Sequence, residues 1–455
     1  MTTDSRDPAG PPRLADGVEL LGEFSGSGIA EPPGLVRRAD GQVIQLSRLL
    51  YLVTRLIDGS RGPDSIAALV TAELGRSLSG DQVSYLITAK LAPLGLVTDR
   101  AKPAALPTAS PLLALRARAT LLPAAAADIA GTFLRPLFRW PVVAAVIIGA
   151  ASLDYWILSV NGLAAALRQI LGNPDDLLVV AGLSVVSALF HECGHAAGCR
   201  YGGARPGRIG VGIYLVWPSF FTNVTDSYRL SRAGRLRTDL GGLYFNLIFI
   251  LALAGVYTAT SWRILLLVIV LTHLEMLEQL LPFVRFDGYF ILSDLVGVPD
   301  LFTRVVPVVR GTLSRRYRDP RATGLRRCAR IVITAWVLCV IPLLTLTLGY
   351  LLLHLPQADR ALWHSMTQAA HLAAAAVAGH QYGDAAADAI GAALAAVSIA
   401  GSLYIAAGLL RRGISLGSRW SAGRPARRLL AVIAAIACTV PLTLLWLAQG
   451  QFSDW

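Results

Sequence analysis

Charged residues are scarce in this chain of 455 residues: they make up only 15% of it, whereas hydrophobic residues make up 54%. Soluble globular proteins usually carry about 25% charged residues, and disordered chains have little apolar content. Only five cysteines are present, in or beside apolar segments and without an even spacing, so a disulfide scaffold is excluded and reduced thiols are expected. The composition predicts a membrane protein with a soluble part.

Lysine is nearly absent, because 39 of the 41 basic residues are arginine. The net charge of +12 would suit a nucleic-acid partner, but the arginines gather in short segments between apolar runs, which is the positive-inside pattern of membrane proteins. We therefore expect a lipid bilayer and no nucleic acid as partner. A secretory signal peptide is also missing, so the first ~140 residues are expected to stay in the cytosol.

The first hundred residues differ in composition from the rest. Residues 1–16 are rich in Pro, Asp and Gly and are predicted to be disordered. Residues 17–100 are predicted to form a small cytosolic winged-helix domain of α+β type. Its expected elements are two strands within 34–47 around the turn Asp40-Gly41, followed by helices over 47–58, 63–74 and 79–95. Residues 101–139 are expected to be a Pro/Ala linker followed by an amphipathic helix over 111–139 at the membrane surface.

Seven apolar runs are long enough to cross a bilayer, which takes about 20 residues. The expected fold is therefore an α-helical polytopic membrane protein. Three Arg-rich loops (200–238, 287–330 and 411–428) hold 22 arginines, whereas the opposite loops hold three, so the first set is expected in the cytosol with the N-terminus. The predicted spans are 141–160, 177–199, 240–259, 264–286, 331–355, 385–410 and 429–448.

The second apolar run carries the motif His191-Glu192-Cys193-Gly194-His195. Residues four apart share one face of a helix, so both imidazoles can bind one metal ion, and Glu192 can act as general base toward a water that the metal activates. A pair of core histidines is the alternative, but ionisable side chains within a membrane span are costly and mark functional sites. The motif predicts a zinc site with Glu192 as the catalytic base.

The depth of this site follows from its place in the helix. From Leu177 to His191 the helix rises about 21 Å at 1.5 Å per residue. We therefore expect a multi-pass protein of the cell membrane whose active site lies within the bilayer, nearer the cytosolic face.

A third protein ligand is expected, because catalytic zinc sites usually have three. A later apolar run ends at Asp287, after a proline-interrupted helix end on the same side of the membrane. Asp287 is the predicted third ligand, and an ion pair with an arginine such as Arg285 is the alternative. Glu275, Glu278 and His273 compete at similar depth, and we expect the two glutamates to pair with other side chains.

The HECGH helix followed by LLPFVRFDG at the end of another helix resembles the site-2 protease-like family of intramembrane zinc metalloproteases. The resemblance covers roughly residues 140–300 and implies a metalloprotease core there, with His191, His195 and Asp287 as zinc ligands and Glu192 as base. A basic cytosolic loop (301–330) and accessory membrane helices (331–455) would follow.

Two further segments extend the resemblance. Residues 239–246 (DLGGLYFN) are similar to the family's Gly-Pro-x-x-Asn element without its proline, which implies that Asn246 aids substrate or oxyanion binding; packing between helices is the alternative. Residues 209–228 resemble the family's strand hairpin, whose exposed edge can hold an extended peptide; an interfacial loop is the alternative. Trp217 and Asn223 of this segment are candidate substrate contacts, and Trp217-Pro218 is typical of the bacterial peptide zinc metalloprotease branch.

Residues 34–95 resemble PqqD-like peptide-recognition domains, which bind leader peptides of ribosomally made natural products. A generic winged helix is the alternative. Together the patterns predict a zinc metalloendopeptidase acting on a peptide or membrane-protein segment, with removal of a leader from a ribosomally synthesised precursor as the favoured role. Regulated intramembrane proteolysis of a signalling protein and a non-hydrolytic zinc-binding protein or transporter stay open, as does the oligomeric state.

Overall fold

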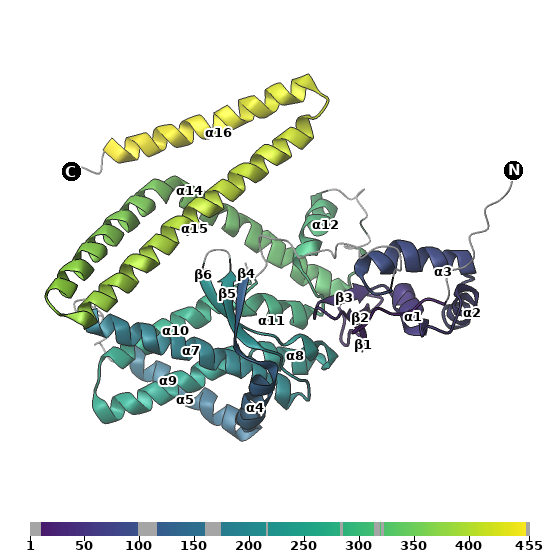
Figure 1. Ribbon diagram of the computed structural model, residues 1–455, viewed down its shortest axis with the longest axis horizontal. Helices are drawn as coiled ribbons and strands as arrows, with labels where there is room; N and C mark the ends of the chain where they lie inside the picture. Colours follow the sequence, from purple (N-terminus) through teal and green to yellow (C-terminus); the bar gives the residue numbers. More distant parts are fainter. Residues whose placement is uncertain are drawn as a thin grey trace.

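The computed structural model is mostly helical, and its two small sheets lie near the N-terminus and beside the central helices (Figure 1). The residues that it describes are 11–98, 116–159, 174–214, 217–282, 285–313, 319 and 323–451. Of the segment 1–16 that was predicted to be disordered, residues 1–10 lie outside the described residues, as do the linker 101–110 and the first part of the amphipathic segment. Residues 11–16 are ordered instead: Leu14 forms an antiparallel bridge with Val97, and the N–H of Ala15 donates to the carbonyl oxygen of Leu96.

Residues 14–97, here called the N-terminal unit, have their own hydrophobic core. An antiparallel sheet in the order β1 (Glu19–Glu23), β2 (Gly34–Arg37) and β3 (Val43–Leu46) precedes α1 (Arg48–Leu56), α2 (Pro63–Leu74) and α3 (Gly80–Leu86). The expected strand pair around Asp40-Gly41 and the three helices are confirmed, whereas β1 was not expected. Local sequence explains the helix ends: Ser79 and Gln82 form a capping box before α3, and Gly95 stops the last turn with a left-handed backbone.

Five helices in the described residues are long and apolar enough to cross a membrane, as in a polytopic membrane protein. They belong to α5 (Trp140–Ser159), α7 (Pro174–Tyr201), α9 (Gly241–Thr260), α14 (Arg327–Ala378) and α15 (Tyr382–Ser421). The other two predicted spans correspond to α10 (Ile264–Leu280), which has only 17 residues, and α16 (Pro425–Gln451). The total of seven spans stays a prediction.

Strand β4 (Arg116–Leu122) corrects one expectation, because residues 111–139 were expected to form a single amphipathic helix. Within the described part, β4 pairs with β5 (Ile209–Tyr214), which pairs with β6 (Trp217–Thr222), and a helix, α4, runs only from Ala124 to Leu134. The Arg-Ala-Arg-Ala-Thr alternation of 116–120 suits a strand, and Pro123 separates the strand from the helix. The hairpin expected within 209–228 is confirmed.

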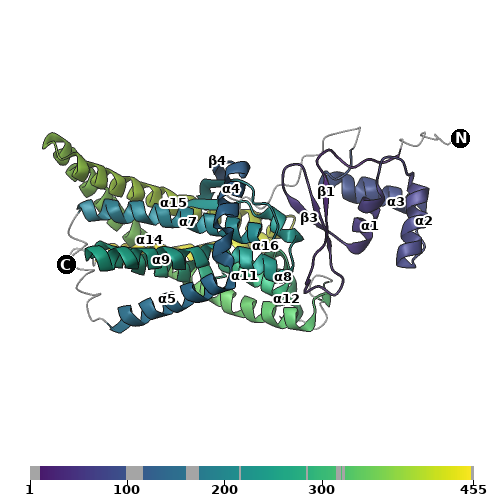
Figure 2. The same cartoon turned by 90° about the horizontal axis from the view of Figure 1, so that it is seen from below.

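Helix α7 is central to the membrane helices and lies against α4, α9 and the short α8 (Arg232–Asp239) (Figure 2). Its crossing with α9 is backbone to backbone: a Cβ on Gly194 would lie 2.2 Å from the carbonyl oxygen of Gly241. Small residues at a crossing permit this close approach in membrane helices, and the approach brings the start of α9 to the HECGH motif.

The N-terminal unit lies at one end of α7 and α9 (Figure 2). Its loop after β1 is bound to the helical part by backbone hydrogen bonds: Gly28 donates to Gly297, and Arg326 donates to Gly28. The fully buried Arg235 of α8 donates to the carbonyl oxygen of Ser25 and lies 4.1 Å from the ring centre of Phe24. The two parts therefore share a tight polar contact.

The C-terminal helices are longer than one membrane span requires. Helix α14 has 52 residues, and Pro342 and Pro356 lie inside it. This helix continues beyond the predicted span 331–355 and ends at Ala378. Helix α15 then runs back antiparallel to α14 (Figure 1). Their role as accessory elements stays a prediction.

Candidate metal centre and its cavity

Helix α7 presents His191, Glu192 and His195 next to α9, and all three residues are buried, with 4%, 8% and 8% of their surface exposed. The i, i+4 spacing places both imidazoles on the same face, as expected. Their Nε2 atoms lie 3.0 Å apart. Two nitrogen lone pairs at this distance repel each other unless a proton or a metal cation lies between them.

Asp287 opens helix α11 (Asp287–Val296) just after the end of α10. The neighbouring Gly288 permits this tight connection, because a Cβ there would lie 2.1 Å from the carbonyl oxygen of Leu280. The Oδ2 atom of Asp287 lies 3.0 Å from Nε2 of His191 and 3.4 Å from Nε2 of His195. The structure thus brings together the three side chains predicted as ligands, and Arg285 pairs with Asp300 instead.

The three donor atoms fit a zinc ion. Donors that bind one zinc tetrahedrally at about 2.0–2.1 Å lie roughly 3.3–3.4 Å from one another, close to the observed 3.0–3.4 Å. The other ring nitrogen of His195, Nδ1, lies 2.8 Å from the carbonyl oxygen of Thr238. A carbonyl at this place accepts the Nδ1 proton and leaves the Nε2 lone pair for a metal. The donor set is therefore a possible metal site.

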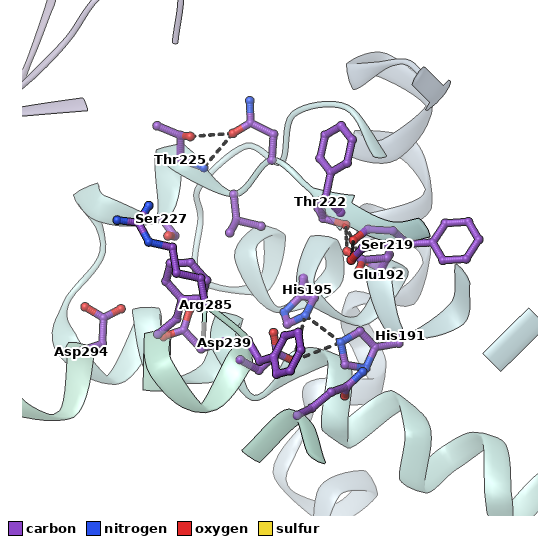
Figure 3. Close-up of a pocket in the computed structure, with 18 of the residues that line it drawn as sticks. His191, Glu192, His195, Ser219, Thr222, Thr225, Ser227, Asp239, Arg285 and Asp294 are labelled. Carbon is purple, nitrogen blue, oxygen red and sulfur yellow. Dashed lines mark hydrogen bonds and ion pairs between the residues drawn. The ribbon is translucent and has the colours of Figure 1, made fainter. Parts of the chain in front are cut away.

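Glu192 lies in a cavity of about 360 Å³ that also contains the three donors. Strand β6 forms one wall, and Figure 3 shows Glu192 beside Thr222 and Ser219, with His191 and His195 facing each other nearby. The Thr222 hydroxyl lies 2.7 Å from Oε2 of Glu192. The base expected from the sequence is thus placed in the same cavity as the predicted ligands.

Two further carboxylates, Asp239 and Asp294, line the cavity. Burial raises the pKa of Asp239, which lies outside the candidate spans, well above its usual range, and the neighbouring Asp294 adds to the shift. Arg235 donates to Asp294 at 2.8 Å. Asp287 would bind a metal as the ionised carboxylate, just as the two histidines would bind it as neutral imidazoles.

The candidate substrate residues differ in their positions. Asn223 lines the cavity, and its Oδ1 accepts hydrogen bonds from the backbone N–H and the hydroxyl of Thr225. Asn246 is buried on α9, its amide atoms have no partner among the described residues, and it does not line this cavity. Trp217 begins β6, but its side chain lies outside the described part of the chain.

The competing residues of α10 do not join the donor set. Glu275 accepts a hydrogen bond from Gln279 at 3.4 Å, Glu278 is exposed, and His273 pairs with Asp154 of α5 at 2.9 Å. Among the described residues, the cluster able to hold a metal consists of His191, His195 and Asp287.

Three features of the site were not found from the sequence. Thr222 contacts Glu192, the backbone carbonyl of Thr238 contacts His195, and Gly242 lies against the His191 ring, where a Cβ would be 2.2 Å from Nε2. Nothing in the local sequence predicts the first two contacts. Thr222 is 30 positions from Glu192, and the backbone carbonyl that contacts His195 is a group that every residue type has. The Gly241-Gly242 pair was the available signal for the third.

Comparison with curated proteins finds a related sequence. Over 126 residues the chain is 27% identical to the "Putative peptide zinc metalloprotease protein YydH" of Bacillus subtilis (strain 168). The match covers 27% of this chain and 50% of that protein, so the chain spans about half the length of the curated relative it matches. No family model and no solved structure matches the chain.

Proposed function

We propose that this chain is a membrane-embedded zinc metalloprotease. The observation that carries the proposal is the triangle of His191, His195 and Asp287 donor atoms, 3.0–3.4 Å apart, in one cavity with Glu192. Five apolar helices and the similarity to a protein named as a peptide zinc metalloprotease support the same class. A binding protein or transporter needs the ligands but has no need of a carboxylate base beside them.

Each residue then has a definite task. His191, His195 and Asp287 would hold the ion, which when bound supplies a Lewis acid that lets water act as a nucleophile near neutral pH. The Glu192 carboxylate accepts the proton of the attacking water and returns it to the leaving amine nitrogen. The buried position of Glu192 and the two histidines limits the access of bulk water to these steps.

The substrate in this proposal is an extended peptide. Strand β6 pairs with β5 on one side, is the outer strand of its sheet, and its residues 219–222 line the cavity. An outer strand offers unpaired backbone groups to which an extended peptide can add as a further strand. A substrate helix would have to unwind before its peptide bond reached the donors.

We further propose that the N-terminal unit presents a leader peptide for removal. The support is the position of this unit: Arg37 of β2 donates to Asp226 at 3.2 Å, and Asp226 lies in the loop 223–229, most of which lines the cavity. A peptide held by the unit would therefore reach the cavity over a short path. The N-terminal unit would lie in the cytosol, with the Arg-rich segments.

The test uses the full chain in nanodiscs, with metal analysis and cleavage of a library of quenched fluorescent peptides. We expect about one zinc per chain and cleavage that is lost with a chelator and restored with zinc. Glu192→Gln should retain zinc and lose cleavage by a factor of at least 10², whereas the control Glu278→Gln, an exposed glutamate of α10, should match the wild type.

Other results would separate the alternatives. Absence of zinc, or full cleavage by Glu192→Gln with zinc bound, would refute a metalloprotease. Cleavage of a membrane-anchored signalling protein, with no cleavage of precursor peptides, would favour regulated intramembrane proteolysis over leader removal.

A further inference from the structure

The Thr222 side chain is the polar group on β6 that contacts Glu192. Its hydroxyl oxygen lies 2.7 Å from Oε2 of the Glu192 carboxylate and 3.0 Å from the backbone carbonyl oxygen of the same residue. A hydroxyl has one proton to donate. Because hydrogen bonds to a charged acceptor are shorter and stronger than those to a neutral one, the proton belongs to the carboxylate when Glu192 is ionised.

The threonine is held in place independently of Glu192. In the β5–β6 ladder, Thr222 is paired with Ile209, which is fully buried. Ile209 packs with Ala127 of α4 and Ala196 of α7, so this end of the sheet is anchored on the same helix that carries Glu192. The hydroxyl therefore approaches the carboxylate from a rigid support, which is what precise placement of a catalytic group requires.

In the described sheet, the edge of β6 away from β5 has no strand paired to it. Residues 219–222 of this strand line the cavity. Backbone hydrogen bonds of β6 would set the position of a peptide added to this edge, while the Thr222 hydroxyl of the same strand holds the Glu192 carboxylate. One strand thus sets the position of both reaction partners.

We infer that Thr222 is a positioning residue: it holds the Glu192 carboxylate in line with a peptide bound along β6. The inference rests on the proposed protease function and assigns no metal contact to Thr222. Loss of the hydroxyl should leave Glu192 free to turn about its side-chain torsions, so fewer substrate complexes would have the base correctly aligned. Peptide binding, which depends on the backbone of β6, should change little.

Three variants in nanodiscs test this. Thr222→Val keeps the shape and removes the hydroxyl, and we expect kcat to fall about tenfold or more, as for loss of one hydrogen bond to a charged group, with KM and zinc content within about twofold. Thr222→Ser should restore most of kcat. The control Thr120→Val removes the hydroxyl of an exposed threonine on β4 of the same sheet and should match the wild type.

A second measurement is independent of any substrate. The chain has seven glutamates, so infrared spectra of protein labelled with ¹³C-glutamate, after subtraction of the spectrum of Glu192→Gln, isolate the Glu192 carboxylate band. We expect Thr222→Val to shift this band and Thr222→Ser to return it. An unshifted band in Thr222→Val would overturn the inference.

The two proposals fail in distinguishable ways. If Glu192→Gln abolishes cleavage while Thr222→Val cleaves like the wild type, the role of Thr222 is wrong and the protease function stands. If no zinc-dependent cleavage occurs in the wild type, the protease function fails, and the positioning role of Thr222 fails with it. A rise in KM with unchanged kcat in Thr222→Val would indicate a substrate contact and would also overturn the inference.

Discussion

The Nδ1 atom of His195 lies 2.8 Å from the backbone carbonyl oxygen of Thr238, at the end of α8. The contact requires α7 and α8 to approach closely, and Gly198 permits it: a Cβ there would lie 3.1 Å from the Cα of Thr238. The carbonyl selects the imidazole tautomer whose Nε2 is free. The orientation of this candidate ligand is therefore determined by a helix crossing, and helix packing should control metal affinity.

Gly242 allows a direct test of whether helix packing controls metal affinity. A Cβ at this position would lie 2.2 Å from Nε2 of His191, so Gly242→Ala should displace the ring and weaken zinc binding by tenfold or more. The control is Gly255→Ala on the same helix, where a Cβ would meet nothing within 4 Å. Zinc titration with a competing chelator measures both. Equal affinity of Gly242→Ala and the wild type would contradict the site geometry.

Arg235 should matter for stability. Its side chain is fully buried, donates to Asp294 at 2.8 Å and to two backbone carbonyls, and lies over the Phe24 ring. Arg235→Met would leave Asp294 buried without its cation, which costs about 3–5 kcal/mol. Thermal unfolding in detergent should show a clearly lower Tm.

The matched control for Arg235 is Arg55→Met. Arg55 pairs with Glu73 at 2.5 Å on the surface of the N-terminal unit, with 46% and 41% of the two side chains exposed. Exposed pairs contribute about 0–1 kcal/mol, so its Tm should hardly change. Equal Tm values for the two variants would show that the buried pair has no special role.

Asp226 should hold the loop that lines the cavity. Its carboxylate accepts hydrogen bonds from the Arg37 side chain and from the backbone N–H of Arg205. It also forms an ion pair with Arg229, three residues later, at 2.9 Å. Asp226→Ala removes all three, so hydrogen–deuterium exchange in residues 223–229 should accelerate several-fold. Glu73→Gln, which removes a surface pair of α2, is the control, and unchanged exchange in Asp226→Ala would refute this anchoring role.

The N-terminal unit should fold without the membrane helices. Its core of residues such as Val36, Val53, Ile66 and Leu91 is formed within residues 14–97. A fragment of residues 1–98 is expected to unfold cooperatively in urea, with a modest stability of about 3–5 kcal/mol because so small a core buries little surface. A fragment with a gradual, non-cooperative loss of circular dichroism would show that the unit depends on its contacts with α8.

Structural features that depend on residues within one or two helical turns of each other could be predicted from the sequence. Helix α2 was expected over 63–74 and is found over Pro63–Leu74, because Pro and Asp at its start and apolar spacing act locally. The same holds for His191 and His195, whose helical spacing alone places them on one face. By contrast, residues 116–122 were misassigned, since their alternation gives a strand only where β5 is available to pair with them.

The sequence by itself determined the membrane-helix composition, the helix with two imidazoles and a neighbouring carboxylate, and Asp287 as the candidate third ligand. Only the tertiary structure decided which atoms meet: Asp287 with the imidazoles, Thr222 with Glu192, and the Thr238 carbonyl with His195. The physical reason is range. Periodicity and caps act over a few residues, whereas these contacts join segments 30 to 96 positions apart. Gly194 and Gly198 let the helix backbones approach, and Gly242 leaves room for the His191 ring.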